Sequence, residues 1–317
     1  IGYTREEVLA RRMTDIVAEH ERERVPGGLA ELLDGLPHVS QLEYVRKDGT
    51  RLAGEVSAQL LPDGRVIRIL RYITARKHAE WERETTVEFL RLANAHTGTP
   101  ELIRAAVLFF QERSGCEAMG IRLREGDDYP YHEARGLPPE FVQLDNSLCT
   151  HDADGKPLRG ADGNPLLACM CGSVIGGRFD ASQPFFTQRG SFWTNNASAL
   201  LAGAAGPDHL SRMRDRCLGQ GFESVALIAL RAGGEPLGLL QLNDRQRGKF
   251  TAESLALWER LADSLAVALA KVRAEEALRQ GRERLAGVVD SAMDSIISVD
   301  RSQRIIPSRN TYSPCPP

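Results

Sequence analysis

The sequence predicts an α+β fold in which an antiparallel sheet carries flanking helices. Two β-hairpins predict the strands: segments 39–46 and 51–61 meet at an Asp-Gly turn, and segments 222–231 and 236–242 meet at a Gly-Gly turn. Apolar residues at helical spacing before and after the second hairpin predict the helices. We expect the larger sheet to contain five or six strands.

Charge and hydropathy exclude several classes of function. The net charge is −3, and the basic residues alternate with acidic ones, so no basic stripe for nucleic acid is present. No apolar run approaches the roughly 20 residues that cross a bilayer, and the chain opens without a signal peptide. We therefore expect a cytoplasmic protein whose cysteines are reduced.

The N-terminal third predicts helix, then sheet, then helix. Thr4 and Glu7 form a capping-box pattern ahead of apolar residues at helical spacing, which predicts a helix over 1–25. A short helix over 29–33 is expected next. Segment 66–73 adds a third strand, and Thr74 is expected to cap a charged connector helix.

The remainder predicts a second helix-and-sheet region and a long final helix. A helix over 101–113 ends at Gly115, and short strands follow at 119–124 and 129–133. Thr251 caps the final helix. A 3-4 spacing in that helix predicts a coiled-coil seam, formed by Trp258, Leu261, Leu265, Ala268 and Val272.

Two end segments resemble PAS domains. Residues 1–77 resemble the second half of one, through Gly2-Tyr3-Thr4-Arg5-Glu6-Glu7, Arg46-Lys47-Asp48-Gly49-Thr50 and the exit Tyr72-Ile73-Thr74-Ala75-Arg76-Lys77. Residues 288–306 resemble the opening of another, with a first strand expected at 295–299.

Residues 98–271 resemble a GAF domain. The resemblance rests on Gly115-Cys116, on the strands 224–230 and 236–242, and on Phe250-Thr251. It is closest to a cysteine-bearing GAF subgroup of bacterial PAS/GAF sensor proteins. The motifs of that subgroup are Asn146-Ser147-Leu148-Cys149, Cys169-Met170-Cys171-Gly172, Gly190-Ser191-Phe192-Trp193-Thr194-Asn195 and Arg216-Cys217.

These resemblances imply a domain order typical of a multidomain sensor. The expected parts are the C-terminal part of a PAS domain (1–77), a connector helix (78–97), the GAF domain (98–271), a coiled-coil connector (272–287), the start of a second PAS domain (288–306) and a disordered tail (307–317). The resemblance further implies a fragment of a sensor histidine kinase or diguanylate cyclase that forms a homodimer through its connector helices.

Four cysteines are the sharpest chemical feature. Cys149, Cys169, Cys171 and Cys217 together offer four thiolates, a set that holds zinc or an iron–sulfur cluster. A reversible disulfide, Cys169–Cys171 or Cys149–Cys217, is a version of the same hypothesis. The alternative is that the thiols pack as small hydrophobic groups.

A second candidate is a small-molecule pocket formed by Phe192, Trp193, Asn195 and Asn196. An aromatic surface beside carboxamides suits a planar polar ligand. The competing interpretation places the two rings in the core and uses the asparagines to cap turns. Residue statistics favour this competing interpretation.

The sequence contains no catalytic motif that we can identify. A phosphate-binding glycine loop, a Gly-x-Ser-x-Gly elbow, a phosphoacceptor box and a Gly-Gly-Asp-Glu-Phe motif are all absent from it. The expected function is therefore a sensory module that detects a small ligand, a metal or a redox state and signals through a helix. The alternative is the sensory portion of a histidine kinase.

Overall fold

The computed structural model describes residues 1–26, 38–160, 163–203, 220–291 and 300–304. The chain divides into two compact units, residues 1–90 and 91–317, and each is treated by itself. No described helix is both long and apolar enough to span a membrane.

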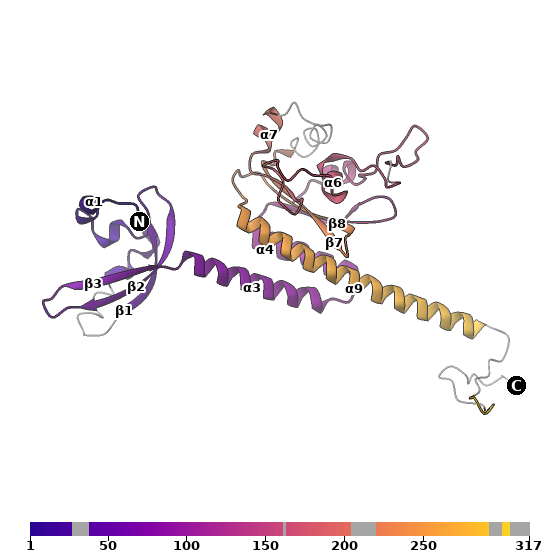
Figure 1. Cartoon of the computed structure of the whole chain (residues 1–317), viewed down its shortest axis with the longest axis horizontal. Helices are drawn as coiled ribbons and strands as arrows, with labels where there is room; N and C mark the ends of the chain where they lie inside the picture. The colour runs from indigo at the N-terminus through magenta and orange to yellow at the C-terminus, as the bar shows by residue number, and fades with distance from the viewer. Residues whose placement is uncertain (27–37, 161–162, 204–219, 292–299, 305–317) are drawn as a thin grey trace. The chain divides into compact units, whose positions relative to one another are not determined.

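The first unit is built on a three-stranded antiparallel meander. Strands β1 (His38–Val45), β2 (Arg51–Leu60) and β3 (Val66–Tyr72) pair in the order β1-β2-β3, as the turn signals predict (Figure 1). Val17, Tyr44, Leu52 and Val56 are buried together on one face of this sheet. The alternation of buried and exposed residues along β2 follows from the two-residue period of a strand.

The long helix expected over residues 1–25 is absent, and this prediction was wrong. In the described part of this range, α-helix is present in α1 (Arg5–Leu9), which has the expected Thr4–Glu7 capping box, and from residue 24 to residue 26. Two short 3-10 turns lie between them at Met13–Asp15 and Glu19–Glu21. Val17 instead forms an antiparallel bridge with Tyr44. Val17 and its neighbour Ile16 are buried against the sheet without forming a helix, because tertiary packing overrides the helical preference of the local sequence.

The connector helix α3 (Thr74–Ala95) begins at Thr74, the residue that was expected to cap it. The Thr74 hydroxyl accepts a hydrogen bond from the backbone N–H of Ala53 at 3.0 Å, which ties the start of the helix to β2. The Thr74 side chain therefore binds the backbone of β2, and Thr74 is the first residue of the helix and not the predicted cap before it.

The second unit contains a five-stranded antiparallel sheet, within the expected range. Its strands are β4 (Ala118–Leu123), β5 (Tyr131–Arg135), β6 (Phe192–Thr194), β7 (Ser224–Ala232) and β8 (Glu235–Asp244), in the order β5-β4-β8-β7-β6. Gly233 and Gly234 both have positive φ angles, +61° and +87°, which the tight turn between β7 and β8 requires.

Helices cover the two faces of this sheet differently. α4 (Thr99–Ser114) and α9 (Ala252–Ser291) lie side by side against one face (Figure 1). The short helix α6 (Cys169–Ile175) covers the other face, while α5 (Pro139–Leu144) and α7 (Ala197–Gly203) lie in the connecting segments. Successive side chains along a strand point to opposite faces of the sheet, so each strand residue lies either on the face covered by α9 or on the face covered by α6.

The predicted coiled-coil seam packs inside its own unit. Four of its five residues are at most 3% exposed and Ala268 is partly buried, because α9 lies against β7 and α4; the four are Trp258, Leu261, Leu265 and Val272. Their 3-4 spacing is therefore explained by intramolecular packing. Beyond Val272 the 40-residue helix, about 60 Å long, becomes largely exposed through residue 285.

Several expectations fall outside the described residues. These are the short helix at 29–33, the strand at 295–299, the tail at 307–317 and Cys217.

A close contact between backbones in the centre of the sheet gives a test of the fold. A methyl group on Gly238 would collide with the carbonyl oxygen of Arg122 on β4, which is backbone and cannot rotate away. We expect Gly238→Ala to lower the free energy of unfolding by about 1–3 kcal/mol, measured by urea denaturation.

Gly281→Ala is the matched control. Gly281 lies in α9 with open space around it, so alanine should raise stability by about 0.5–1 kcal/mol. Equal stabilities for Gly238→Ala and the parent protein would contradict the pairing of β4 with β8.

Candidate functional site

A row of buried polar side chains lies on the α6 face of the five-stranded sheet. Arg122 of β4 and Gln241 and Asn243 of β8 are all fully buried. Asn243 pairs with Ala118, and Gln241 pairs with Leu227, and both of these partners belong to the apolar cluster under α6. Three polar side chains therefore interrupt an apolar surface at the place where α6 covers it.

Arg122 is held as a buried cation by neighbouring groups. Its guanidinium forms an ion pair with Asp145 at 2.7 Å and donates to the backbone carbonyls of Tyr129, Asp145 and Asn146. It also lies 3.6 Å from the centroid of the Tyr131 ring. Burial by itself lowers the pKa of Arg122, but Tyr131, Cys171 and Asp145 outweigh that effect and raise it.

Several polar atoms of this row have no hydrogen-bond partner within the described part of the chain. They are Nε of Arg122, Nε2 of Gln241 and both amide atoms of Asn243. The other amide atom of Gln241, Oε1, accepts from the Tyr131 hydroxyl at 2.8 Å. An unmade hydrogen bond costs about 1–3 kcal/mol for each buried group, so this row is expected to bind water or a ligand.

Two of the predicted cysteines begin the helix that covers the row. Cys169 is the first residue of α6, with a φ angle of +64° that is uncommon for a residue other than glycine. The Cys171 side chain and the backbone N–H groups of Cys171 and Met170 donate to its sulfur, and they lower the pKa of Cys169 to about 7. Both cysteines lie on this helix, within its first turn.

Gly172 allows α6 to pack against the segment that leads into it. A methyl group there would lie 2.6 Å from the carbonyl carbon and 2.7 Å from the carbonyl oxygen of Leu167. Leu167 in turn bridges Cys149, which brings the third predicted cysteine to the same entry segment. Burial and the nearby Asp128 carboxylate raise the pKa of the Cys149 thiol.

The described residues do not assemble a metal site. Among them, no group of three or more His, Cys, Asp or Glu side chains could hold a metal ion. Cys217, the fourth predicted ligand, lies outside the described residues. The four-cysteine metal site therefore stays a prediction.

The predicted aromatic–amide pocket is distributed over two faces of the sheet. Phe192 pairs with Leu227 and Trp193 with Ala226, so neighbouring positions place the two rings on opposite faces. Phe192 is buried on the α6 face. Asn195 and Asn196 both have hydrogen-bond partners within the chain.

Each asparagine joins elements of the fold. The Asn195 amide donates to the carbonyl of Phe250 at 2.7 Å and accepts from the N–H of Phe250 at 2.9 Å, which links β6 to the start of α9. The Asn196 side chain accepts from Ser198 and Ala199 at the start of α7. A ligand-binding role for Phe192, Trp193, Asn195 and Asn196 stays a prediction.

Sequence reasoning missed Arg122, Gln241 and Asn243. Their signal is weak but present: each is a polar residue at an inward position of a strand that is otherwise apolar. A strand buried on both faces normally has an almost continuous apolar run. Polar residues inside such a run must find partners, and this requirement marks them as candidates.

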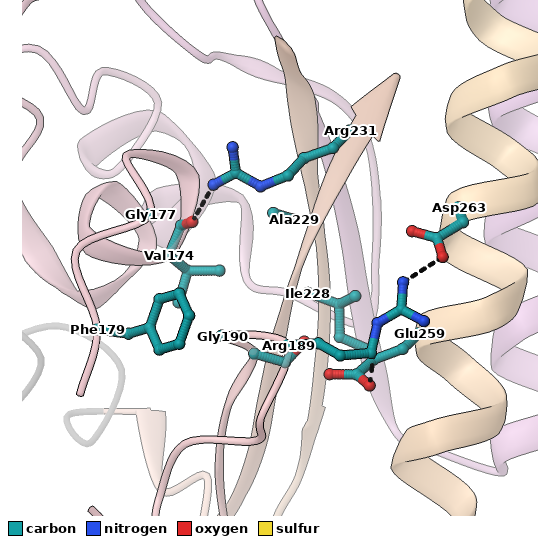
Figure 2. Close-up of a pocket in the computed structure, with 11 residues that line it drawn as sticks. Val174, Gly177, Phe179, Arg189, Gly190, Ile228, Ala229, Arg231, Glu259 and Asp263 are labelled. Carbon is teal, nitrogen blue, oxygen red and sulfur yellow. Dashed lines mark hydrogen bonds and ion pairs between the residues drawn. The ribbon is translucent and has the colours of Figure 1, made fainter. Parts of the chain in front are cut away.

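A small cavity lies at the edge of β7, between α6 and α9. It has a volume of about 160 Å³, and Figure 2 shows Val174 and Phe179 on one side and Glu259 and Asp263 on the other. The Arg231 guanidinium donates to the carbonyls of Val174 and Ile175 at 3.0 and 2.7 Å. This cavity separates the helix that covers the polar row from the long final helix.

Comparison with known proteins supports the fold. The model of the GAF domain family matches residues 101–269. A search of curated proteins finds no match to the chain.

Solved structures with low sequence identity are similar to this chain. One is a domain of a putative two-component sensor histidine kinase from Sinorhizobium meliloti 1021 (16% identity, 58% of this chain, 98% of that chain, TM-score 0.38). A second is the free methionine-R-sulfoxide reductase from Neisseria meningitidis (15% identity, 62% of this chain, 93% of that chain, TM-score 0.42). A third is the phytochrome photosensory core module of Stigmatella aurantiaca (16% identity, 92% of this chain, 56% of that chain, TM-score 0.43). The family model covers more than half of this chain, and the chain therefore belongs to the GAF domain family.

Proposed function

We propose that this chain is a cytoplasmic sensory module whose GAF domain binds a small polar ligand on the α6 face of its sheet. The buried row with unpartnered atoms on Arg122, Gln241 and Asn243 is the observation that carries the proposal. GAF domains are commonly small-ligand sensory modules, which agrees with this assignment.

The chemistry of the row favours a neutral ligand with hydrogen-bond acceptors. Arg122 Nε and Gln241 Nε2 are donors, and Asn243 offers both a donor and an acceptor. The positive charge of Arg122 is already matched by Asp145, and the Cys169 thiol close by is partly ionised near pH 7. An anion would find no unmatched positive charge here, whereas an amide or carbonyl compound would complete the hydrogen bonds.

Helix α9 is the proposed output element. Its apolar stripe packs on the opposite face of the sheet that holds the row, so a shift of β7 and β8 reaches the helix directly. The exposed part of α9 beyond Val272 would carry the change to an output domain outside this chain. Dimerisation through this exposed part is included in the proposal.

In a second version of the proposal, the chain is the sensory portion of a histidine kinase. A phosphoacceptor box and an ATP-binding region in the protein sequence beyond residue 317 would support it. Autophosphorylation of this chain alone should be negative in both versions, because the chain has no phosphoacceptor motif.

A substitution in the row should separate stability from ligand binding. Asn243→Leu removes two unpartnered polar atoms, so we expect the ligand-free protein to gain about 1–3 kcal/mol in free energy of unfolding. The same variant should lose the rise in melting temperature that neutral amide and carbonyl compounds give with the parent protein.

Leu240→Met is the matched control for this experiment. Leu240 lies on the same strand but on the α9 face, so ligand binding should be retained. If no compound stabilises the parent protein and Asn243→Leu is destabilised, the amide holds a structural water molecule and the ligand proposal fails.

Thiol redox sensing is a second candidate function, favoured by the hydrogen bond between the two α6 cysteines. A peroxide could oxidise them to a disulfide: the two thiols lose two electrons and two protons, and the peroxide is reduced to two water molecules. Both residues are free cysteines in the structure.

Alkylation rates test this second candidate. Cys169 has a pKa lowered to about 7, whereas burial raises the pKa of Cys116 to about 11, and both side chains are buried. After allowing for the lower nucleophilicity of the more acidic thiol, iodoacetamide should modify Cys169 about 100-fold faster than Cys116 at pH 7. The rate at Cys169 should rise as the pH passes through 7, followed by peptide mass spectrometry, and a rate that rises only above pH 9 would contradict the proposal.

The metal prediction has its own measurement. If Cys149, Cys169, Cys171 and Cys217 hold zinc or an iron–sulfur cluster, anaerobically purified protein should contain about one zinc per chain or show cluster absorbance. Cys169→Ser/Cys171→Ser should lose the metal and Cys116→Ser should keep it. A colourless, metal-free protein would leave the small-ligand proposal in place and remove the metal site.

A further inference from the structure

The segment between α6 and β6 connects the two faces of the GAF sheet. We call residues 176–191 the strap. It begins directly after α6, which covers the polar row, and ends directly before β6. Its side chains contact α9 on the opposite face of the sheet (Figure 2).

At its start, the strap is fixed to α6. Arg231 of β7 donates to the last carbonyls of that helix, Val174 and Ile175, where a cation is electrostatically favourable. Arg178 of the strap donates to the carbonyl of Leu167 at 3.0 Å, so the strap also holds the segment that leads into α6. A displacement of α6 therefore moves the start of the strap.

The middle of the strap is packed as a unit. The Phe179 ring lies on Gly190, where a methyl group would collide with it and where the φ angle is +85°. Phe185 and Phe186 form ring contacts at 5.2 Å, and both contact Phe192 at the start of β6. The two ends of the strap are thus packed together and cannot move independently.

At its far end, the strap is bound to α9 through a buried carboxylate. The Thr187 hydroxyl donates to Glu259 Oε1 at 2.6 Å, and Glu259 is only 5% exposed. Arg189 lies 3.7 Å from the other oxygen of Glu259 and pairs with Asp263, one turn further along α9. A buried charge that depends on these partners is costly to separate from them.

The cavity of about 160 Å³ lies between these two anchor points. Close-packed interiors have low compressibility and transmit strain, whereas a cavity gives the side chains around it room to move. Val174 of α6, Phe179 of the strap and Glu259 of α9 all line this cavity, so each of these three elements has a side chain with room to move (Figure 2).

We propose that the strap transmits a displacement of α6 to α9 through Thr187, Arg189 and Glu259. The inference rests on the proposed function, because it names the route by which the covered site regulates the output helix. Glu259 is a positioning residue in this scheme. Its removal uncouples α9 from α6 and leaves the polar row unchanged.

The test displaces α6 without a ligand. Gly172→Ala pushes α6 away from Leu167, and hydrogen–deuterium exchange of the full chain reports on the α9 segment 255–266. We expect exchange in this segment to become about tenfold faster. In the Glu259→Leu background, the addition of Gly172→Ala should cause no further acceleration in α9.

Glu275→Leu is the matched control, because it makes the same substitution on an exposed part of α9. The tenfold response to Gly172→Ala should persist in that background. If Gly172→Ala prevents folding, Arg231→Gln is the milder displacement, since it removes only the anchor on the last carbonyls of α6.

An equal response in the parent, Glu259→Leu and Glu275→Leu backgrounds would overturn the proposal, as would no response of α9 to either displacement. Because no ligand is used, the result is independent of the ligand experiments. If α9 responds to the displacement of α6 but no ligand is detected, only the proposed function is refuted. If a ligand binds but α9 does not respond through Glu259, only the proposed role of the strap is refuted.

Discussion

The buried guanidinium of Arg122 is the interaction on which the rest of the α6 face depends. A charge inside a sheet is tolerated only when ion pairs and hydrogen bonds replace its hydration. Asp145 supplies the ion pair, and the carbonyls of Tyr129 and Asn146 supply further acceptors. Tyr129 lies just before β5, and Asp145 and Asn146 follow the end of α5, so the charge organises both of these segments around β4.

This organisation extends from Arg122 to the cysteines. The Asn146 side chain accepts from the N–H of Tyr131, and Asp128 accepts from the N–H groups of Leu148 and Cys149. These contacts hold the segment that pairs with the entry to α6. Burial raises the pKa of Asp128, but hydrogen bonds from the Ser147 hydroxyl and from the N–H groups of Tyr129, Leu148 and Cys149 outweigh burial and lower it.

The alternation of side chains in the five-stranded sheet places the polar row and the packing surface of α9 on opposite faces. In β8, Gln241 and Asn243 lie on the α6 face, while Leu240 and Leu242 lie on the α9 face. One strand thus contributes to both the polar row and the packing of the long helix. The apolar stripe of α9 has the spacing of a coiled coil because packing against a sheet and packing against a partner helix both require apolar residues along one face of the helix.

The sequence by itself determined the hairpins, the start of α9 and the glycine-ended α4, because turn residues and caps act over a few neighbouring positions. It did not determine the fate of residues 1–25, since apolar spacing alone does not distinguish a helix from irregular chain that packs on a sheet. Only the tertiary structure decided that Asp145 neutralises Arg122, that Cys171 donates to Cys169 and that Asn195 joins β6 to α9. These contacts depend on how distant segments meet or how side chains turn, and local pattern does not encode that geometry.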